Sequence, residues 1–414
     1  MRNVLFSLVV FSAITLMADP WQITVDLSTQ KNIAADREDS SWIGYQDSSD
    51  GNWNLWYFSL GDSSNHQITD FPEDEIDPSA DGSRIAFVQS GDDFKYLWLY
   101  YRDGDSLSQL TNTPWAITNP SLSRCYVAAV SYEFSSPNII LVNTVSLDTT
   151  YLTGDNDVFV QNLSPFIFGG DTVLYVHCHD GYRDIMMCVL STGIITQLTI
   201  NGEYYSPKGS GHYVVAEDHN VGHEIVLLDI VTMGMITVSD SCIGLSIDHF
   251  SPDVLGNWVT FITRSFPFSR YFVRKYEIST GIKTEIHSLL MPGNTLAKPA
   301  LSSRGTFWSG TDFGNFDIFA VLIEDSCRAL SAETLLAAVP AEINLFVYPN
   351  PFNGACNIEA PRGSKVKIFN VLGGCVAEFV GPTWVPKNLS SGVYAVICVT
   401  PDGKKCSKEV LYVK

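Results

Sequence analysis

Apolar residues between positions 21 and 326 gather in short runs that are separated by polar turns. The runs are rich in Val, Ile, Phe and Tyr, which fit the pleated and half-buried surface of a strand. Typical runs are RIAFV at 84–88, VLYV at 173–176 and HYVV at 212–215. The pattern predicts an all-β structure for this part of the chain.

The runs recur with a period of about forty residues. The strongest copies close on an apolar residue followed by Thr, at Thr69, Thr111, Thr153 and Thr199, which lie 42, 42 and 46 residues apart. Weaker copies of this close follow at 237–239 and 285–287. One unit makes a small antiparallel sheet with two apolar faces. Such a sheet becomes stable only when further sheets cover both faces.

Two further markers recur in phase with this close. A Ser-centred segment precedes an apolar run, and we interpret it as a turn that caps its own backbone. It occurs at 79–82, 121–124, 164–165, 206–209, 251–253 and 302–305. A polar residue then precedes the next apolar run, at Asn54, Asn138, Asp184, Glu224 and Asp317.

Together the three markers resemble the WD40-like repeat of TolB-type β-propellers, in which small sheets pack side by side around an axis. The resemblance covers residues 21–326 and implies a β-propeller over 19–326. We count seven units and expect a seven-bladed ring, with a six-bladed ring as the alternative because TolB-type propellers have six. The last unit lacks an outer strand, so we expect the alternating segment 21–27 to supply it and close the ring.

The chain changes character after residue 326. Residues 327–343 predict a linker with a short helical stretch, and residues 344–414 predict a small Ig-like β-sandwich of about seven strands. Four motifs in this last part resemble the type A C-terminal sorting domain of the type IX secretion system. They are LFVYPNPFN at 345–353, KVKIFNVLG at 365–373, LSSGVY at 389–394 and KEVLYVK at 408–414. The resemblance implies that the type IX machinery carries the chain across an outer membrane. An adhesive domain retained on the mature protein is the alternative.

Residues 1–18 predict a secretory signal peptide, with Arg2 before an apolar stretch and Ala18 at the cleavage site. No later stretch reaches 18 consecutive apolar residues, so we expect no membrane span in the mature chain. The net charge is −20, and residues 343–414 contribute eight Lys and Arg against four Asp and Glu, or +4, which leaves −24 for the rest. An acidic body argues against nucleic acid as a partner.

Nine cysteines leave at least one free thiol and define no pairing scheme. Cys398 and Cys406 flank a turn signal at 401–403, so the two could face each other across a hairpin. Cys178 and Cys188 are placed in a similar way around Asp180 and Gly181.

Four histidines form one candidate metal site. His177 and His179 alternate onto the same face of an expected strand, and His219 and His223 occupy the equivalent loop of the next unit. Equivalent loops of adjacent blades lie on the same propeller face, so the four rings could bind zinc or copper. Solvated loop histidines are the alternative.

Other residues offer less specific signals. The segment 154–157 (GDND) could bind calcium, although Asp also caps loop backbone. Ser210 lies near His212 but falls in an expected blade turn, which favours a structural role over a nucleophile. Exposed aromatic residues could form a platform for carbohydrate or peptide, or could pack between blades. They include Trp53, Trp56, Trp98, Trp115, Tyr204 and Tyr205.

The sequence carries no Walker loop, GxSxG, HExxH or EF-hand pattern. We therefore expect a secreted or cell-surface scaffold that binds an extracellular protein or glycan without a cofactor. One alternative is an extracellular glycan lyase or hydrolase with a site in the propeller channel, which converging His, Arg, Lys and carboxylate groups would favour. A periplasmic partner of the TolB kind is a third hypothesis, and the sorting motifs count against it.

Overall fold

The computed structural model describes residues 20–24, 28–37, 41–220, 222–240, 247–266, 270–289, 296–312, 315–322, 345–348, 352–360, 364–370, 375–379, 383–386, 389–399 and 405–414. The predicted signal peptide and linker lie outside these residues. In the described part, the regular structure consists of strands and one 3₁₀ segment, η1 (Arg102–Gly104). The prediction of an all-β protein is confirmed.

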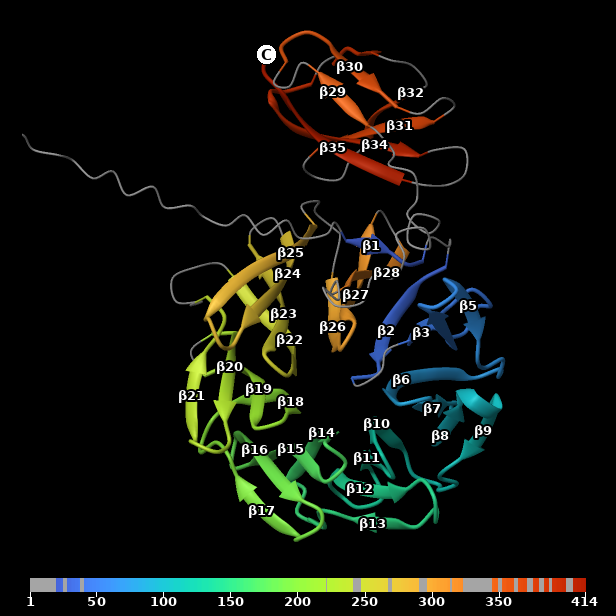
Figure 1. The fold of residues 1–414 in the computed structure, drawn as a ribbon, viewed down its shortest axis with the longest axis vertical. Helices are drawn as coiled ribbons and strands as arrows, with labels where there is room; N and C mark the ends of the chain where they lie inside the picture. Colours follow the sequence, from blue (N-terminus) through green and yellow to red (C-terminus); the bar gives the residue numbers. More distant parts are fainter. Residues whose placement is uncertain are drawn as a thin grey trace, which may run out of the picture.

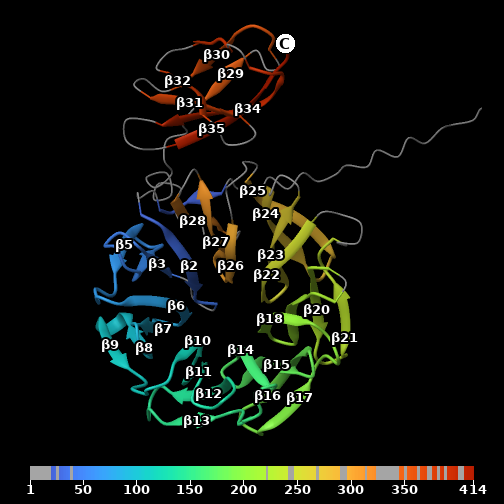
Figure 2. The same ribbon diagram turned by 180° about the vertical axis from the view of Figure 1, so that it is seen from behind.

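Seven four-stranded antiparallel sheets follow one another from Trp21 to Leu322 and surround a common axis (Figures 1 and 2). The first sheet contains β2 (Gln30–Ala35), β3 (Trp42–Asp47), β4 (Asn54–Ser59) and β5 (Ser64–Gln67). The second contains β6 (Asp74–Asp81), β7 (Arg84–Ser90), β8 (Lys95–Tyr101) and β9 (Ser106–Gln109). The third contains β10 (Ile117–Ser123), β11 (Tyr126–Ser131), β12 (Asn138–Asn143) and β13 (Thr149–Tyr151).

The remaining four sheets repeat this order. The fourth contains β14 (Gln161–Phe168), β15 (Thr172–His179), β16 (Tyr182–Val189) and β17 (Ile194–Gln197). The fifth contains β18 (Tyr204–Ser210), β19 (Tyr213–Asp218), β20 (Glu224–Asp229) and β21 (Gly234–Thr237). The sixth contains β22 (Ile247–Leu255), β23 (Trp258–Ser265), β24 (Arg270–Glu277) and β25 (Ile282–Leu289). The seventh contains β26 (Leu296–Ser302), β27 (Gly305–Asp312), β28 (Asn315–Leu322) and β1 (Trp21–Gln22).

Both faces of each sheet are buried against a neighbouring sheet. In β11, for example, Val127 and Ala129 pack on the second sheet, whereas Ala128 packs on the fourth. Ile43 of the first sheet and Phe307 of the seventh belong to one apolar cluster, and the innermost strands β2 and β26 are in contact. Burial of both faces explains why a single unit could not fold alone, and the last contact closes the ring.

The N-terminal strand supplies the outer strand of the last sheet, as the sequence predicts. Trp21 pairs with Ala320 and Gln22 with Phe319 in antiparallel register. The backbone N–H of Ile23 then donates to the carbonyl of Ile318 at 2.7 Å. The paired strand is shorter than the predicted segment, and residues 25–27 lie outside the described residues.

The Thr that closes each strong repeat has one structural role. Its hydroxyl accepts a hydrogen bond from the backbone N–H fourteen residues earlier, near the start of the third strand. These bonds run to Thr69 from Leu55, to Thr111 from Leu97, to Thr153 from Ile139 and to Thr199 from Ile185, each at 2.8–2.9 Å.

The Ser-centred marker has two outcomes. At 79–82, 121–124 and 302–305 it reaches the turn between the first and second strands of its sheet, as predicted. At 164–165, 206–209 and 251–253 it lies inside the innermost strand, and there the prediction of a turn is wrong. These three copies lie at a β-bulge, a feature that recurs in the innermost strand of each of the seven sheets and in which one residue has positive φ and Pro usually follows. Pro has no N–H to donate and fits at a bulge, where the ladder of hydrogen bonds is interrupted. The seven bulge residues are Asn32, Asp77, Asn119, Ser164, Ser206, Ser251 and Lys298, with φ from 38° to 54°.

The two predicted cysteine pairs have different outcomes. Cys398 lies opposite Cys406 in the register of β34 (Gly392–Val399) and β35 (Lys405–Tyr412), as predicted. Cys178 lies opposite Arg183 and Cys188 opposite Val173, so these two cysteines do not face each other. The prediction failed because the turn between their strands is centred on Asp180 and Gly181, both at positive φ, and not midway between the cysteines.

The C-terminal part contains two antiparallel sheets. One has the order β29 (Phe346–Tyr348), β30 (Cys356–Glu359) and β33 (Thr383–Trp384). The other has the order β32 (Cys375–Phe379), β31 (Lys365–Asn370), β34 and β35. Residues of both sheets share one apolar core, which includes Ile358, Trp384 and Val396. In the described part of the chain, no helix is long and apolar enough to cross a membrane.

Candidate functional site

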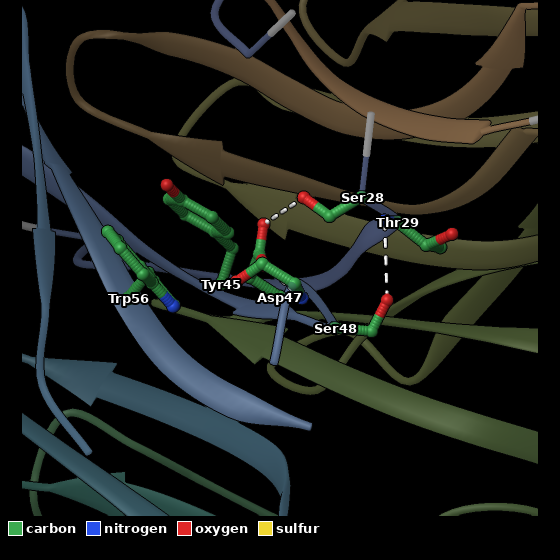
Figure 3. A pocket seen from close by; sticks show the side chains of 7 residues that line it. Ser28, Thr29, Tyr45, Asp47, Ser48 and Trp56 are labelled. Carbon is green, nitrogen blue, oxygen red and sulfur yellow. Dashed lines mark hydrogen bonds between the residues drawn. The ribbon is translucent and has the colours of Figure 1, made fainter. Parts of the chain in front are cut away.

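An open pocket of about 530 Å³ lies at the first sheet (Figure 3). It lies at the end of the sheet where the second strand turns into the third, and we call this side of the ring the hairpin face. Because β2 and β3 are antiparallel, the start of β2 and the end of β3 meet there, with Gln30 opposite Asp47. The lining residues are Ser28, Thr29, Tyr45, Asp47, Ser48, Ser49 and Trp56.

Asp47 holds the polar side of this pocket in place. One carboxylate oxygen accepts from the Ser28 hydroxyl at 3.0 Å and from the Gln30 side-chain amide at 2.6 Å. The other oxygen accepts from the backbone N–H of Ser49 at 2.7 Å. Thr29 and Ser48 add two hydrogen bonds between the same loops. The carboxylate is 4% exposed and fixes the hydroxyl groups around it.

Two aromatic residues form the apolar side. Tyr45 is almost fully buried, and its hydroxyl donates to the side-chain oxygen of Asn65 at 2.8 Å. The indole nitrogen of Trp56 has no hydrogen-bond partner among the described residues. A buried N–H without a partner is uncommon in proteins, so this donor is notable next to a pocket.

The second sheet provides an internal comparison for Trp56. Trp98 occupies the same register position in β8, because Trp56 lies opposite Gln67 and Trp98 lies opposite Gln109. The indole N–H of Trp98 donates to the side-chain oxygen of Gln89 at 2.9 Å. The equivalent donor is therefore satisfied within the second sheet and unsatisfied at the pocket of the first.

A second pocket, of about 490 Å³, occupies the equivalent position of the second sheet and has an acidic lining. Glu73 accepts from Gln89 at 3.0 Å, and Asp74 accepts from the backbone N–H of Trp53 at 2.8 Å. The lining residues are Pro72, Glu73, Asp74, Ser90, Gly91, Asp92, Asp93 and Phe94.

The four predicted histidines form two pairs on the hairpin face. The rings of His177 and His179 lie 5.1 Å apart, and those of His219 and His223 stack at 4.1 Å. The Nδ1 atom of His177 lies 2.8 Å from the side-chain oxygen of Asn162. In the described residues, no group of three or more His, Cys, Asp or Glu side chains is placed to hold a metal ion. The zinc site stays a hypothesis without geometric support.

Burial lowers the pKa of His177, and the nearby His179 lowers it further. His179 contacts the buried carboxylate of Asp184 at 3.2 Å, and His219 contacts Glu217 at 3.1 Å. These contacts explain how the rings are held without a metal.

Tyr205 joins the two sheets that carry the histidine pairs. Its ring stacks on His219 at 4.3 Å, and the Arg183 guanidinium lies 4.8 Å from its centre on the side of the fourth sheet. Tyr205 is among the aromatic residues expected from the sequence to form a platform, whereas Arg183 is not among the predicted site residues. The signal was available, because Arg183 lies next to Asp184, which marks the start of a repeat strand.

The two other candidates have structural contacts. Asp155 accepts from Asn162 through its carboxylate, and Asp157 accepts from the backbone N–H of Phe159 at 3.0 Å. The Ser210 hydroxyl accepts from the backbone N–H of Gly256 in the next sheet at 3.1 Å. The two Asp residues hold the loop in place, and Ser210 joins two neighbouring sheets.

Comparison with known proteins identifies the C-terminal part. Residues 346–412 match the family described as secretion system C-terminal sorting domain. A comparison with curated protein sequences finds no match.

Solved structures show the fold of the larger part. An oligogalacturonate lyase in complex with manganese is 12% identical, with a TM-score of 0.57 over 75% of this chain and 95% of the lyase. The acylaminoacyl peptidase of Pyrococcus horikoshii is 11% identical, with a TM-score of 0.54 over 82% of this chain and 59% of the peptidase. TolB of Acinetobacter baumannii is 14% identical over 70% of this chain and 78% of TolB, at a TM-score of 0.42, too low to argue from. Identities this low establish a shared fold and no shared activity.

Fold and match together define a β-propeller protein with a type IX secretion sorting domain. The chain is handled by the type IX machinery and is a secreted or cell-surface protein.

Proposed function

We propose that the propeller is a binding scaffold outside the cell and that it holds a glycan in the pocket of the first sheet. The unsatisfied indole N–H of Trp56 carries the proposal, because the equivalent Trp98 has an internal partner. A ligand acceptor in the pocket would satisfy this donor. Hydroxyl groups beside an aromatic ring suit a sugar, which presents hydroxyls along its edge and C–H groups on its face.

The environment of Asp47 favours binding over hydrolysis. Both of its oxygens already accept hydrogen bonds, so the carboxylate is a fixed acceptor and is poorly placed to accept or give a proton. Hydrolysis of a glycosidic bond usually uses two carboxyl groups on either side of the bond. Asp47 is the one carboxylate among the described residues that line this pocket.

A glycan array probed with the mature full-length chain tests the proposal. We then expect the Trp56→Phe variant to bind the selected glycan about tenfold more weakly by calorimetry, because one hydrogen bond from a buried donor is lost. Trp98→Phe is the matched control and should bind as the wild type does. The proposal fails if no glycan is retained, or if Trp56→Phe binds it as tightly as Trp98→Phe.

A further inference from the structure

Lys208 lies in the innermost strand of the fifth sheet, directly after the bulge at Ser206 and Pro207. Its side chain is half-buried, and its ammonium nitrogen lies 4.3 Å from the centre of the Phe166 ring in the fourth sheet. No ion pair or hydrogen bond joins this ammonium to another residue in the described ranges. A cation is thus held inside the ring against an aromatic face.

Arg37 comes to the same place from the opposite side of the ring. It follows β2 of the first sheet, yet its guanidinium donates to the carbonyl oxygens of Gly209 at 3.2 Å and Val254 at 2.6 Å, in the fifth and sixth sheets. The guanidinium also lies 4.7 Å from the Phe166 ring centre. The segment after β2 therefore reaches across the axis at the face opposite the hairpin face.

Asp253 pairs with Arg37 and is the carboxylate whose charge acts on Lys208, and its hydrogen bonds are already made. One oxygen forms an ion pair with Arg37, and the other accepts from the backbone N–H of Leu301 at 2.7 Å. Asp253 is 6% exposed. It neutralises Arg37 and leaves the charge of Lys208 without a direct counterion.

Lys298 adds a further positive charge. It is the bulge residue of the innermost strand β26 in the seventh sheet, and its side chain is exposed. Burial lowers the pKa of Lys208 to about 8, Asp253 opposes this, and Arg37 and Lys298 lower it further. At pH 7 the Lys208 ammonium is still mostly charged. The charge of Lys298 thus acts on Lys208, inside a propeller that carries a large negative charge.

We propose that Lys208 and Lys298 bind a small oxyanion with two or more negative charges at the inner strands on this side of the ring. Unpaired cations that are partly removed from water are costly, and a charge-assisted hydrogen bond to an anion relieves that cost. The site lies at the face opposite the Trp56 pocket and is independent of the glycan proposal.

Carboxylate and phosphate oxygens share this chemistry, so the test has two arms. Citrate and inorganic phosphate are titrated separately by calorimetry into the mature full-length chain at pH 7 and low salt, with sodium chloride at matched ionic strength as the reference. We expect at least one of the two anions to bind the wild type and chloride to give no signal. Binding of citrate alone assigns the site to carboxylates, and binding of phosphate alone assigns it to phosphates.

Two variants locate the binding. Lys208→Met keeps the length of the side chain and removes the charge, and we expect it to bind the anion at least tenfold more weakly. Lys298→Gln changes an exposed residue and should weaken binding severalfold without affecting folding. The matched control is Lys275→Met. Lys275 in β24 is also a partly buried lysine, burial lowers its pKa, and its ammonium nitrogen lies 3.8 Å from the centre of the Trp258 ring.

The proposal is overturned if neither anion binds the wild type above the chloride reference. It is also overturned if Lys208→Met and Lys298→Gln bind as the wild type does, or if Lys275→Met loses binding to the same degree. Trp56→Phe should keep full anion binding, which separates a failure here from a failure of the glycan proposal.

Discussion

At the scale of single residues, Glu75 is a buried acid without a cation beside it. It lies in β6 with no exposed surface, and one carboxyl oxygen has no partner among the described residues. Burial raises the pKa of Glu75 to about 8, and the nearby Glu73 and Asp74 raise it further, although a hydrogen bond from Thr69 opposes the shift. Glu75 is therefore protonated in the folded chain at neutral pH.

Glu75→Gln should change how stability depends on pH. The unfolded chain ionises Glu75 above about pH 4.3 and the folded chain only above about pH 8, so the free energy of unfolding falls by about 1.4 kcal/mol per pH unit between these values. This loss of stability is complete near pH 8 and absent below about pH 4. Chemical denaturation at a series of pH values measures this slope, and Glu75→Gln should lack it. A variant with the wild-type slope between pH 5 and 8 contradicts the assignment, and the exposed Asp93→Asn is the control.

The sequence predicts local juxtapositions well and distant ones poorly. His177 and His179 were expected to be neighbours because side chains alternate along a strand, and their rings are close. Arg37 and Lys208 were missed, because Arg37 contacts Gly209, which is 172 residues away in the chain. Such a contact depends on how the ring closes, and no local pattern records it.

At the scale of strands, one bulge recurs in the innermost strand of every sheet. At three of the seven bulges the sequence shows Ser-Pro, at 164–165, 206–207 and 251–252, but this signal does not reveal the place of the bulge, because the same residues also favour turns. The residue directly after the Pro therefore occupies an equivalent position in the innermost strand of each of these sheets. Ser79 and Ser121 at that position accept a backbone N–H of the next sheet, whereas Lys208 cannot accept one. Placing the markers on the inner strand would have singled out Lys208 as the one basic residue at this position, where the other sheets have Ala34, Ser79, Ser121, Phe166, Asp253 and Ala300.

Closure by the N-terminal strand depends on Thr24. Its hydroxyl accepts from the backbone N–H of Ile318 at 2.9 Å and contacts Gln30 and Asp317, and the residue is 1% exposed. Thr24→Val keeps the shape and removes the acceptor of the buried Ile318 N–H, so the free energy of unfolding should fall by about 2 kcal/mol or more. Urea denaturation measures the change. The exposed Thr150→Val should change it by less than about 0.5 kcal/mol, and equal values for the two variants would argue against this role.

At the scale of the whole molecule, the two parts of the chain have separate tasks. The sheets of the propeller depend on one another, because every apolar cluster between them draws on two neighbours. The C-terminal sheets have a core of their own and match a sorting domain. The sequence predicted this division from the repeat and from the terminal motifs. It did not predict the pocket of the first sheet, because side chains from two strands and two loops assemble it.

Cell fractionation tests most directly that this is a propeller exported through its C-terminal part. The full chain and a chain without residues 346–412 are produced in a bacterium with an active type IX system, and each is followed by immunoblotting and by protease treatment of intact cells. We expect the full chain at the surface or in the medium, and the shortened chain inside the periplasm. Equal export of both chains, or retention of the full chain in the periplasm, would contradict the role of the sorting domain.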